Sequence, residues 1–242
     1  MVCPRGHSFD RSSRGYINLL QPQDRRSKQP GDTPAAVAAR RRIHDRGVTK
    51  PLLEGIGEML SASAPDVVLD AGCGEGFYLG TLARQTGFDG HGVDISTRAI
   101  DAAAKRYPEC EWIAANADRF LPYADASFSI IMSITGRMNP GEFRRVIRDD
   151  GRLVIAVSAP DDLMELRNAS VGEGRDRVDR TVAIFAPLFT LAETKRVTTT
   201  ANLDEAGVQD ILNSIYRPIR SQPIEAMRLT FSLDLLRFRV GS

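Results

Sequence analysis

The stretch Val67–Gly76 constrains the fold of this chain more than any other part of its 242 residues. Its first four residues, 67–70, are mostly apolar and predict a buried parallel strand that ends at Asp70. Gly72, Gly74 and Gly76 follow at every second position, and residues 77–84 then predict the start of a helix. Because glycine has no Cβ, such a turn lets the backbone bend sharply and lets a ligand come close. The stretch therefore predicts a strand, a ligand-accessible turn and a helix in succession.

A second acidic residue stands where the next strand ends. Residues 90–93 form that predicted strand, and Asp94 closes it roughly twenty residues after Asp70, where a carboxylate can hydrogen-bond the two hydroxyls of a ribose. The spacing Gly-x-Gly-x-Gly differs from the dinucleotide-binding pattern Gly-x-Gly-x-x-Gly, and no Lys-Ser or Lys-Thr pair follows as a P-loop would require. Asp70 directly precedes the turn, where a carboxylate can hold a cationic amino group. The alternative is a tight turn that binds no ligand.

The stretch 68–76 resembles the first motif of class I S-adenosylmethionine (SAM) methyltransferases, and Asp94 matches the ribose-binding acid of these enzymes. The resemblance implies SAM as the cofactor, with its adenine at the loop 116–118. The cofactor-binding residues that it implies are Asp70, Gly72, Cys73, Gly74, Gly76, Asp94, Ile95, Asn116, Ala117 and Ser133.

Strand and helix patterns alternate along the rest of the chain at the spacing of βαβ units. Helices are predicted over 51–60, 96–106, 142–147 and 204–215, and further strands over 111–115, 128–134, 151–157, 191–200 and 227–240. Residues 168–180 are polar and glycine-bearing, which predicts a loop. We therefore expect a Rossmann-like α/β domain over 51–242, with a mostly parallel seven-stranded sheet and helices on both faces. A small N-terminal appendage over 1–50 precedes it.

The N-terminal segment is strongly basic although the whole chain carries a net charge of only +1. Between Arg5 and Lys50 there are nine arginine and lysine residues against four aspartates, which indicates a phosphate-rich partner. A solvated surface arm is the alternative. Thr33 and Pro34 predict the start of a helix that carries the arginine cluster. The candidate substrate-binding residues are Arg25, Arg26, Lys28, Arg40, Arg41 and Arg42.

Short motifs in this segment resemble one family, the bacterial 23S rRNA guanine-N1 methyltransferases, which include tylosin-type macrolide-resistance enzymes. The motifs lie at 3–10, 15–20, 30–32 and 39–41, and the stretches 103–108 and 163–166 are similar as well. The resemblance implies that 23S rRNA is the partner and that N1 of a guanine in a hairpin is methylated. It also implies that residues 1–50 are the remnant of a zinc-knuckle RNA-recognition region.

The chain departs from the family pattern at several places. Cys3 and His7 supply two ligands, but the first Cys-x-x-Cys pair of the family is missing, so we expect no zinc. Thr135–Pro140 replaces an aromatic-Ala-Pro segment, Thr49 replaces a tyrosine, and the loop near Arg177 lacks a histidine. These changes leave two alternatives open. One is a methyltransferase that acts on a small molecule, and the other is a transfer-inactive protein that binds SAM or RNA.

The residues that face the methyl acceptor are less well determined. Removal of the guanine N1 proton would be eased by a hydrogen-bond acceptor, for which the candidates beyond the fifth strand are Asp161, Asp162 and Glu165. We assign none of them as the base, and helix capping is the alternative for the aspartates. Candidates for stacking on a splayed-out base are Phe9, Tyr16 and Phe185, with core packing as the alternative for Phe185.

Composition indicates the compartment. Cys3, Cys73 and Cys110 are an odd and sparse set, which argues against a disulfide framework and favours the reducing cytoplasm. We expect no membrane association, because no run of eighteen apolar residues is present and nothing at the N-terminus resembles a signal peptide. The sequence leaves the oligomeric state open, with a homodimer among the alternatives.

Overall fold

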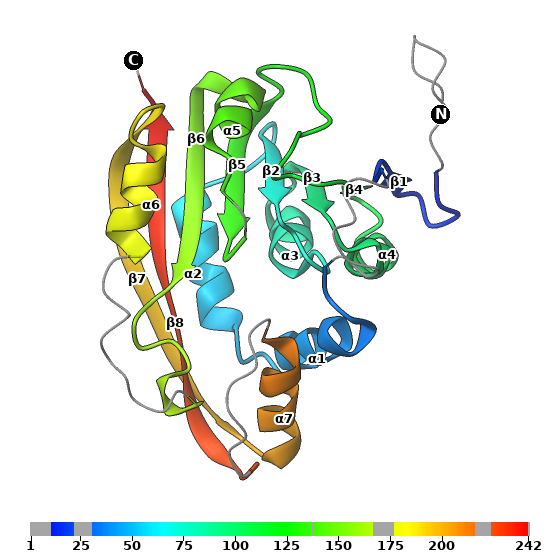
Figure 1. The fold of residues 1–242 in the computed structure, drawn as a ribbon, viewed down its shortest axis with the longest axis vertical. Helices are drawn as coiled ribbons and strands as arrows, with labels where there is room; N and C mark the ends of the chain where they lie inside the picture. Colours follow the sequence, from blue (N-terminus) through cyan, green and yellow to red (C-terminus); the bar gives the residue numbers. More distant parts are fainter. Residues whose placement is uncertain (1–10, 22–30, 137, 167–176, 216–223, 242) are drawn as a thin grey trace.

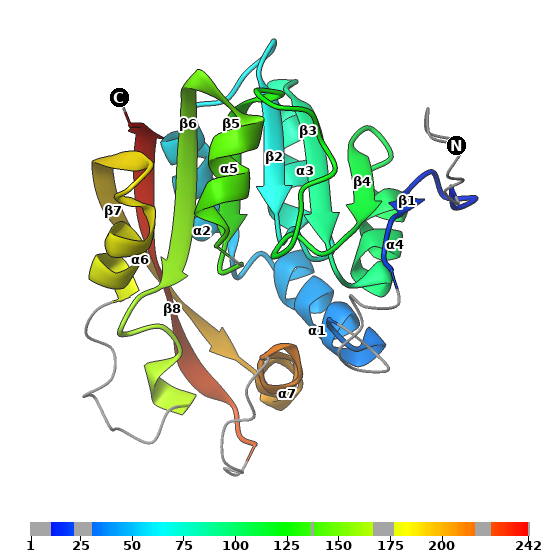
Figure 2. The ribbon, with the colours of Figure 1, turned by 45° about the horizontal axis from the view of Figure 1, so that its top comes forward.

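A computed structural model describes residues 11–21, 31–136, 138–166, 177–215 and 224–241. These residues form one eight-stranded sheet with helices on both faces (Figures 1 and 2). The strands are β1 (Ile17–Asn18), β2 (Val67–Ala71), β3 (Asp89–Asp94), β4 (Glu111–Ala114), β5 (Phe128–Ile134), β6 (Ile147–Ser158), β7 (Phe189–Leu203) and β8 (Met227–Val240). The helices are α1 (Pro34–Asp45), α2 (Lys50–Leu60), α3 (Phe77–Thr86), α4 (Thr97–Arg106), α5 (Pro140–Val146), α6 (Arg177–Phe185) and α7 (Glu205–Ser214), with a short 3₁₀ helix, η2 (Met164–Leu166).

The sheet order places a topological switch point beside β2. The order is β1-β4-β3-β2-β5-β6-β8-β7, and every pair from β1 to β6 is parallel. From β2 the chain continues outward through β3 and β4 on one side, and through β5 and β6 on the other. In such sheets a ligand binds outside the carboxyl ends of the strands at the point of reversal. The predicted glycine turn follows β2 and lies at this point.

The mostly parallel sheet is confirmed, and it has one strand more than the seven expected. The additional strand is β1, in which Ile17 lies opposite Ile113 of β4. Two residues carry too little of a period-2 pattern to be identified as a strand, so the stretch 15–20 reads from sequence only as an extended piece. The last two strand pairs are antiparallel, because β8 lies between β6 and β7 and runs in the opposite direction to both.

The two faces of the sheet have separate cores. Residues of α2, α3 and α4, such as Ile56, Leu79 and Ile100, pack on one face. On the other face Phe185 of α6 is fully buried, and its ring centroid lies 6.0 Å from that of Phe143 and 5.4 Å from that of Phe238. Phe185 is therefore a core residue, which was the alternative to stacking, and it is not available to stack on a base.

The helix α6 begins within the loop that we expected over 168–180. Val178, Thr181, Val182 and Phe185 recur at the helical spacing i, i+3, i+4 and i+7, and Phe185 and Thr181 are buried. The polar residues between them weakened this signal in the sequence. The rest of that loop, 168–176, lies outside the described residues. Within the described residues, no helix combines the length and the apolar character that crossing a bilayer requires.

The helix α1, in the described part of the N-terminal segment, lies against the carboxyl ends of the strands (Figure 1). The helix α1 starts as predicted, because the Thr33 hydroxyl accepts a hydrogen bond from the Ala36 N–H at 3.1 Å and Pro34 occupies the first turn. It then packs beside α7, where the Arg42 guanidinium donates two hydrogen bonds to the Asp210 carboxylate, at 2.9 and 2.6 Å. The helix that carries the arginine cluster is thus docked on the domain.

Candidate active site

The glycine turn between β2 and α3 has the backbone that its glycines predict. Gly72, Gly74 and Gly76 have φ values of 92°, 54° and 76°, in the left-handed region that favours glycine. The N–H groups of Gly72 and Cys73 both donate to the carbonyl of Val93, at 2.8 and 3.1 Å, so β3 holds the turn. An added Cβ on Gly74 would meet no described atom within 4 Å except Arg40 Nη1, at 3.4 Å. The backbone at Gly74 is therefore open toward the carboxyl edge of the sheet, where a ligand can approach.

Asp94 joins the turn to the next helix. One of its carboxylate oxygens accepts a hydrogen bond from the Gly74 N–H at 3.0 Å, and the other accepts from the Ser96 N–H at 2.7 Å. Burial raises the pKa of Asp94, and these two N–H groups offset part of the rise. Ser96 itself caps α4 as predicted, accepting from the Ala99 N–H. Asp94 is thus positioned beside the backbone of Gly74, as a ribose-binding acid would have to be.

Three buried carboxylate oxygens at the turn have no hydrogen bonds among the described residues. Asp70 is 2% exposed and Glu75 is 3% exposed, and neither Asp70 Oδ1 nor the two Glu75 oxygens have a hydrogen-bond partner among the described residues. Burial and then the charge of Asp94 raise the pKa of Asp70; burial also raises the pKa of Glu75, against the opposing charge of Arg40. A buried polar atom without a partner is costly. Together these oxygens without partners favour a ligand that carries positively charged hydrogen-bond donors.

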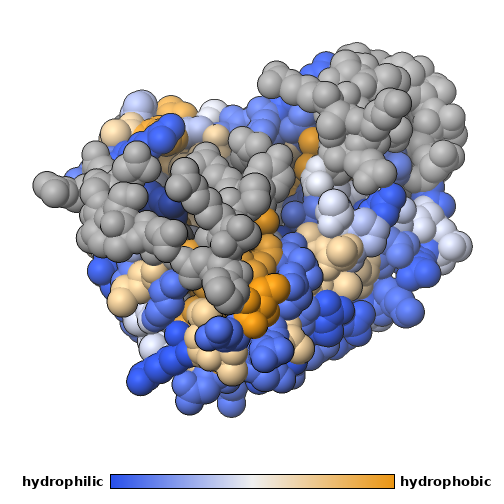
Figure 3. Space-filling model, turned by 60° about the horizontal axis from the view of Figure 1, so that its bottom comes forward, coloured by the Kyte–Doolittle hydropathy of each residue, from blue (hydrophilic) through white to orange (hydrophobic). Residues whose placement is uncertain are grey.

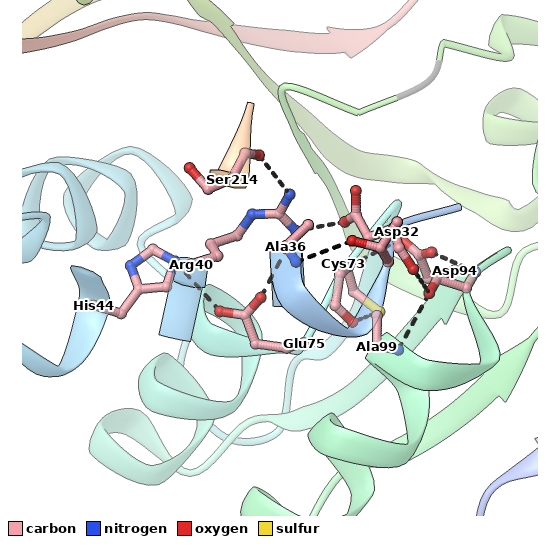
Figure 4. A network of polar contacts seen from close by, with 12 residues as sticks. Asp32, Ala36, Arg40, His44, Cys73, Glu75, Asp94, Ala99 and Ser214 are labelled. Carbon is pink, nitrogen blue, oxygen red and sulfur yellow. Dashed lines mark hydrogen bonds and ion pairs between the residues drawn. The ribbon is translucent and has the colours of Figure 1, made fainter. Parts of the chain in front are cut away.

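Arg40 reaches into the site from α1. Its Nη1 donates to Asp32 Oδ2 at 2.6 Å and its Nη2 donates to the carbonyl of Ser214 at 3.2 Å, while Glu75 Oε2 lies 3.8 Å from Nη1 (Figure 4). Burial lowers the pKa of Arg40, but its hydrogen bond to Asp32 and the nearby carboxylate charges raise it overall, so the guanidinium remains charged. We expected this arginine among the RNA contacts, and in the structure its side chain lies at the glycine turn.

The other candidate RNA contacts are differently placed. Arg41 is about half exposed and pairs loosely with Asp45, at 3.6 Å, whereas Arg42 is bound to Asp210 of α7. Arg25, Arg26 and Lys28 lie outside the described residues, as do Cys3, His7 and Phe9. Among the residues that are described, no group of three or more His, Cys, Asp or Glu side chains is arranged to hold a metal ion.

A buried histidine that the sequence analysis missed lies next to Glu75. The His44 ring stacks on Phe77, with centroids 3.8 Å apart and planes inclined by 7°. Its Nδ1 lies 2.6 Å from Thr49 Oγ1 and its Nε2 lies 3.4 Å from Glu75 Oε1. Burial, with the positive charges of Arg40 and Arg106, lowers the pKa of His44 to about 3, so the ring is neutral at pH 7. No local pattern reveals this contact, because His44 reads in sequence as one polar residue of a helix.

The remaining predicted cofactor residues gather at the same edge of the sheet. The Ala115 N–H donates to the Asp94 carbonyl at 3.0 Å, which brings the loop 116–118 beside the end of β3. Asn139 holds that loop by donating to the carbonyls of Ala117 and Asp118, both at 3.1 Å. Ile95, between Asp94 and Ser96, is half-buried. The hydroxyl of Ser133 is buried and donates to the Ala71 carbonyl at 2.9 Å, which ties β5 to β2.

The three carboxylates proposed near the methyl acceptor have different environments. Glu165 accepts hydrogen bonds from the N–H and the hydroxyl of Thr230, and Asp162 accepts from the Ser232 N–H at 3.1 Å. Asp161 has one oxygen, Oδ1, that is buried without a partner among the described residues. Glu165 and Asp162 therefore serve to hold the η2 segment on β8. Asp161 therefore has one carboxylate oxygen that accepts no hydrogen bond from the described residues.

The molecular face that carries α1 and α7 is largely hydrophilic, with apolar residues gathered in a patch near its middle (Figure 3). Close to the carboxyl end of β5, Thr135 is exposed and has a φ of 50°, which is unusual for a β-branched residue. Its N–H donates to the Ala156 carbonyl at 2.8 Å. The loop after β5, whose sequence departs from the family pattern, thus begins with a constrained backbone.

Comparison with known proteins agrees with this geometry. The family described as a methyltransferase domain matches residues 68–154, the part from β2 to β6. The chain is 32% identical over 209 residues to a 23S rRNA (guanine(748)-N(1))-methyltransferase of Streptomyces fradiae, covering 84% of this chain and 74% of the relative. It is 34% identical over 179 residues to a putative 23S rRNA (guanine-N(1)-)-methyltransferase of Bacillus subtilis, covering 69% of this chain and 61% of that relative.

A solved structure shows the same fold at much lower identity. The SAM-dependent methyltransferase of Thiobacillus denitrificans, in complex with S-adenosyl-L-homocysteine, superposes with a TM-score of 0.53 at 15% identity, covering 78% of this chain and 90% of that one. The chain spans between about three-fifths and three-quarters of the length of the curated relatives reported above. The glycine turn, the acid at the end of β3 and these similarities lead to one conclusion: the chain is a SAM-dependent methyltransferase that belongs to the family of the 23S rRNA guanine-N1 methyltransferases.

Proposed function

We propose that this protein transfers the methyl group of SAM to N1 of a guanine in a 23S rRNA hairpin. The observation that carries the cofactor assignment is the set of orphaned buried oxygens on Asp70 and Glu75 beside the open backbone of Gly74. The acceptor assignment is supported by the relatives, two of which are named as enzymes that act on this position of a guanine in 23S rRNA.

The residues at the turn fit the parts of SAM. Asp94 would bind the ribose hydroxyls, Asp70 would face the amino group, and the loop that contains Asn116 and Ala117 would hold the adenine. SAM, when bound, supplies a methyl group on a positively charged sulfur. The protein's contribution is to align the acceptor with that group and to exclude water, because methyl transfer of this kind is an in-line displacement.

Asp161 offers a hydrogen-bond acceptor that has no partner among the described residues. Guanine N1 carries a proton that must leave before or during attack, and a carboxylate within reach would ease its removal. Among the three acidic residues beyond β6, Asp161 is the one with an oxygen that has no partner among the described residues. A base extruded from an RNA hairpin also needs apolar surface. The apolar patch on the face of α1 and α7 supplies such surface (Figure 3).

The proposed function is tested by mapping the modified base. The protein is incubated with labelled SAM and ribosomal RNA that lacks the modification, and the methylated position is then located. We expect label at N1 of one guanine in a 23S rRNA hairpin. Label on another atom of the RNA, or transfer to small molecules alone, contradicts the acceptor assignment. A protein that binds SAM and RNA without transferring the label is the inactive alternative.

A small-molecule acceptor is the second candidate function, and one observation favours it. The loop after β5 has lost the aromatic-Ala-Pro segment, and its first residue, Thr135, has a strained backbone. Such a change alters the surface next to the methyl group more than it alters the cofactor site. RNA affinity and its dependence on salt distinguish the two candidates.

Replacing Arg25 and Arg26 by alanine is expected to weaken the salt dependence of RNA binding. Each phosphate that a cation neutralises contributes roughly 0.7 to 0.9 to the slope of log affinity against log salt. The double variant should therefore lower the slope by up to about 1.4 to 1.8, measured by titrating the target hairpin at several salt concentrations. We choose this pair because Arg40 and Arg42 are bound to carboxylates of the protein itself.

A matched control removes two arginines from the opposite edge of the sheet. Arg144 lies in α5 and Arg148 lies near the start of β6, away from the carboxyl ends of the strands. Replacing both by alanine should leave the slope unchanged. Equal slopes for wild type and the Arg25/Arg26 variant would show that this part of the segment does not bind RNA, and would favour the small-molecule acceptor.

SAM affinity is expected to fall as the pH drops, over a window above the ordinary pKa of an aspartate, about 3.9. Burial raises the pKa values of Asp70 and Asp94 in the free protein, so both carboxyls bind protons at a higher pH than usual. A cationic ligand binds the ionised forms of these carboxyls, so binding within this pH window releases protons. SAM affinity therefore reaches its maximum only above the window. Calorimetry in two buffers with different ionisation enthalpies measures the release. A heat that is independent of the buffer throughout the window would contradict this expectation.

A further inference from the structure

Resting on the proposed function, we infer that Arg40 binds the carboxylate of the methionine part of SAM. The N-terminal helix α1 would thus supply a residue of the cofactor site, in the segment for which the sequence alone predicted RNA contacts. The inference is carried by the charges around the backbone of Gly74, by the unused donors of Arg40 and by the way α1 is held over the turn.

The charges around Gly74 are arranged for an amino acid in its zwitterionic form. One oxygen of Asp70 and both oxygens of Glu75 lack hydrogen bonds among the described residues, and both side chains are almost fully buried. The guanidinium of Arg40 lies 3.4 Å from the place that a Cβ on Gly74 would occupy. Acceptors that need cationic donors and a cation thus meet at one open stretch of backbone. An α-amino acid carries an ammonium and a carboxylate on neighbouring atoms, and it complements both.

Arg40 has donors to spare. A guanidinium has five N–H groups in a planar fork. One hydrogen bond to Asp32 and one to the Ser214 carbonyl are made, and Glu75 Oε2, at 3.8 Å from Nη1, is too distant to accept a third. The geometry of the fork suits a carboxylate, which it can bind through two parallel hydrogen bonds. Asp32 and Ser214 would therefore hold the arginine while its remaining donors face the ligand.

The backbone near Arg40 leaves little room for α1 to shift. A Cβ added to Gly31 would lie 2.6 Å from Ser96 Cβ, so the start of α1 is in close contact with the start of α4. At the other end of the helix, Arg46 pairs with Asp204 at 2.7 Å. The position of Arg40 is thus set by contacts that do not involve a ligand, and the site is organised before the cofactor arrives.

The neighbouring arginines have carboxylate partners of their own. Arg41 faces Asp45, Arg42 is bound to Asp210, and Arg106 donates through Nη2 to Asp45 at 2.6 Å, while its Nη1 is buried without a partner among the described residues. A purely structural role for Arg40, in which it only holds Asp32, is the competing explanation. That role predicts that loss of the guanidinium changes the affinity for all adenosyl ligands by the same factor. A carboxylate-binding role predicts a loss confined to the ligands that carry the carboxylate.

The test compares three ligands by calorimetry on the full chain. SAM carries the carboxylate, its decarboxylated form carries the sulfonium and the ammonium alone, and 5′-methylthioadenosine lacks the whole amino-acid part. Wild-type protein should bind SAM about tenfold or more tightly than the decarboxylated form, as expected for a hydrogen bond between two charged groups. In Arg40→Gln this preference should shrink to about threefold or less, while the affinity for 5′-methylthioadenosine stays the same.

Controls separate the proposal from a loss of folding and from failure of the proposed function. Arg46→Gln removes an arginine and an ion pair at the other end of α1, and should keep the tenfold preference. Thermal unfolding is recorded for each variant. If Arg40→Gln does not fold, Arg40→Lys takes its place; it retains the charge and should show an intermediate preference for SAM. The proposal is overturned if wild type binds SAM and its decarboxylated form equally, or if Arg40→Gln and Arg40→Lys keep the full preference. Wild type that binds none of the three ligands contradicts the proposed function instead.

Discussion

Replacing Gly76 by alanine is expected to lower the free energy of unfolding by about 2–5 kcal/mol. Two costs add. Gly76 has a φ of 76°, which strains any residue with a Cβ by roughly 1–2 kcal/mol. The new Cβ would also lie 2.3 Å from a ring carbon of the buried Trp112 and 3.0 Å from Ala103 Cβ, so a packed region must shift, at a cost of about 1–3 kcal/mol. Chemical denaturation of the free protein measures the sum.

Gly87 provides a matched control for this prediction. It follows α3, at the other end of the helix that Gly76 caps, and its φ of 78° is almost the same. No described atom lies within 4 Å of an added Cβ there. Gly87→Ala should therefore show the strain of roughly 1–2 kcal/mol alone. If the two variants were equally stable, Trp112 would not restrict the turn. The close packing between the glycine turn and β4 would then contribute nothing measurable to the free energy of unfolding.

Replacing Asp94 by alanine is expected to weaken SAM binding by about tenfold to a hundredfold, because a charged hydrogen-bond acceptor contributes roughly 1.5–3 kcal/mol. Asp94 would lose its contact with the ribose, and the N–H groups of Gly74 and Ser96 would lose their acceptor. Both losses act on the cofactor site. Calorimetry with SAM measures the affinity, and methyl transfer to RNA at limiting SAM should fall in parallel.

Two further variants separate the ribose contact from the support of the turn. Asp94→Asn keeps the shape of the side chain and one acceptor oxygen but removes the charge, so it should retain more affinity than alanine. Asp89→Ala changes an exposed aspartate at the start of the same strand, and it should bind SAM as wild type does. Unchanged SAM affinity in Asp94→Ala would remove this residue from the cofactor site.

Local physical chemistry determined much of the fold and the core of the candidate site. The strand that ends at Asp70, the turn with three left-handed glycines and the helix after it are encoded within ten to twenty neighbouring residues, by backbone freedom and hydrophobic patterning. The caps at Thr33 and Ser96 depend on a side chain and an N–H group three residues away. Asp94 was found because its distance from the turn is set by one βαβ unit.

Short or irregular elements were harder to predict from the sequence. β1 has two residues, and its pairing with β4 exists because the two segments meet in space. α6 has an apolar stripe that polar neighbours interrupt, so the local sequence predicts a loop over part of it. In both cases the stabilising contacts come from distant residues, and the local pattern alone carries too little information.

The partners of the arginine cluster were decided by tertiary structure alone. Arg40 and Arg42 are two residues apart, yet one is held by Asp32 and Ser214 beside the glycine turn and the other by Asp210 on α7. The contact of His44 with Glu75 likewise joins α1 to the turn. Composition showed that the segment is basic, but the direction of each side chain follows from how α1 docks on α7 and α4. That docking depends on surfaces up to 174 residues apart in the chain, which no local pattern encodes.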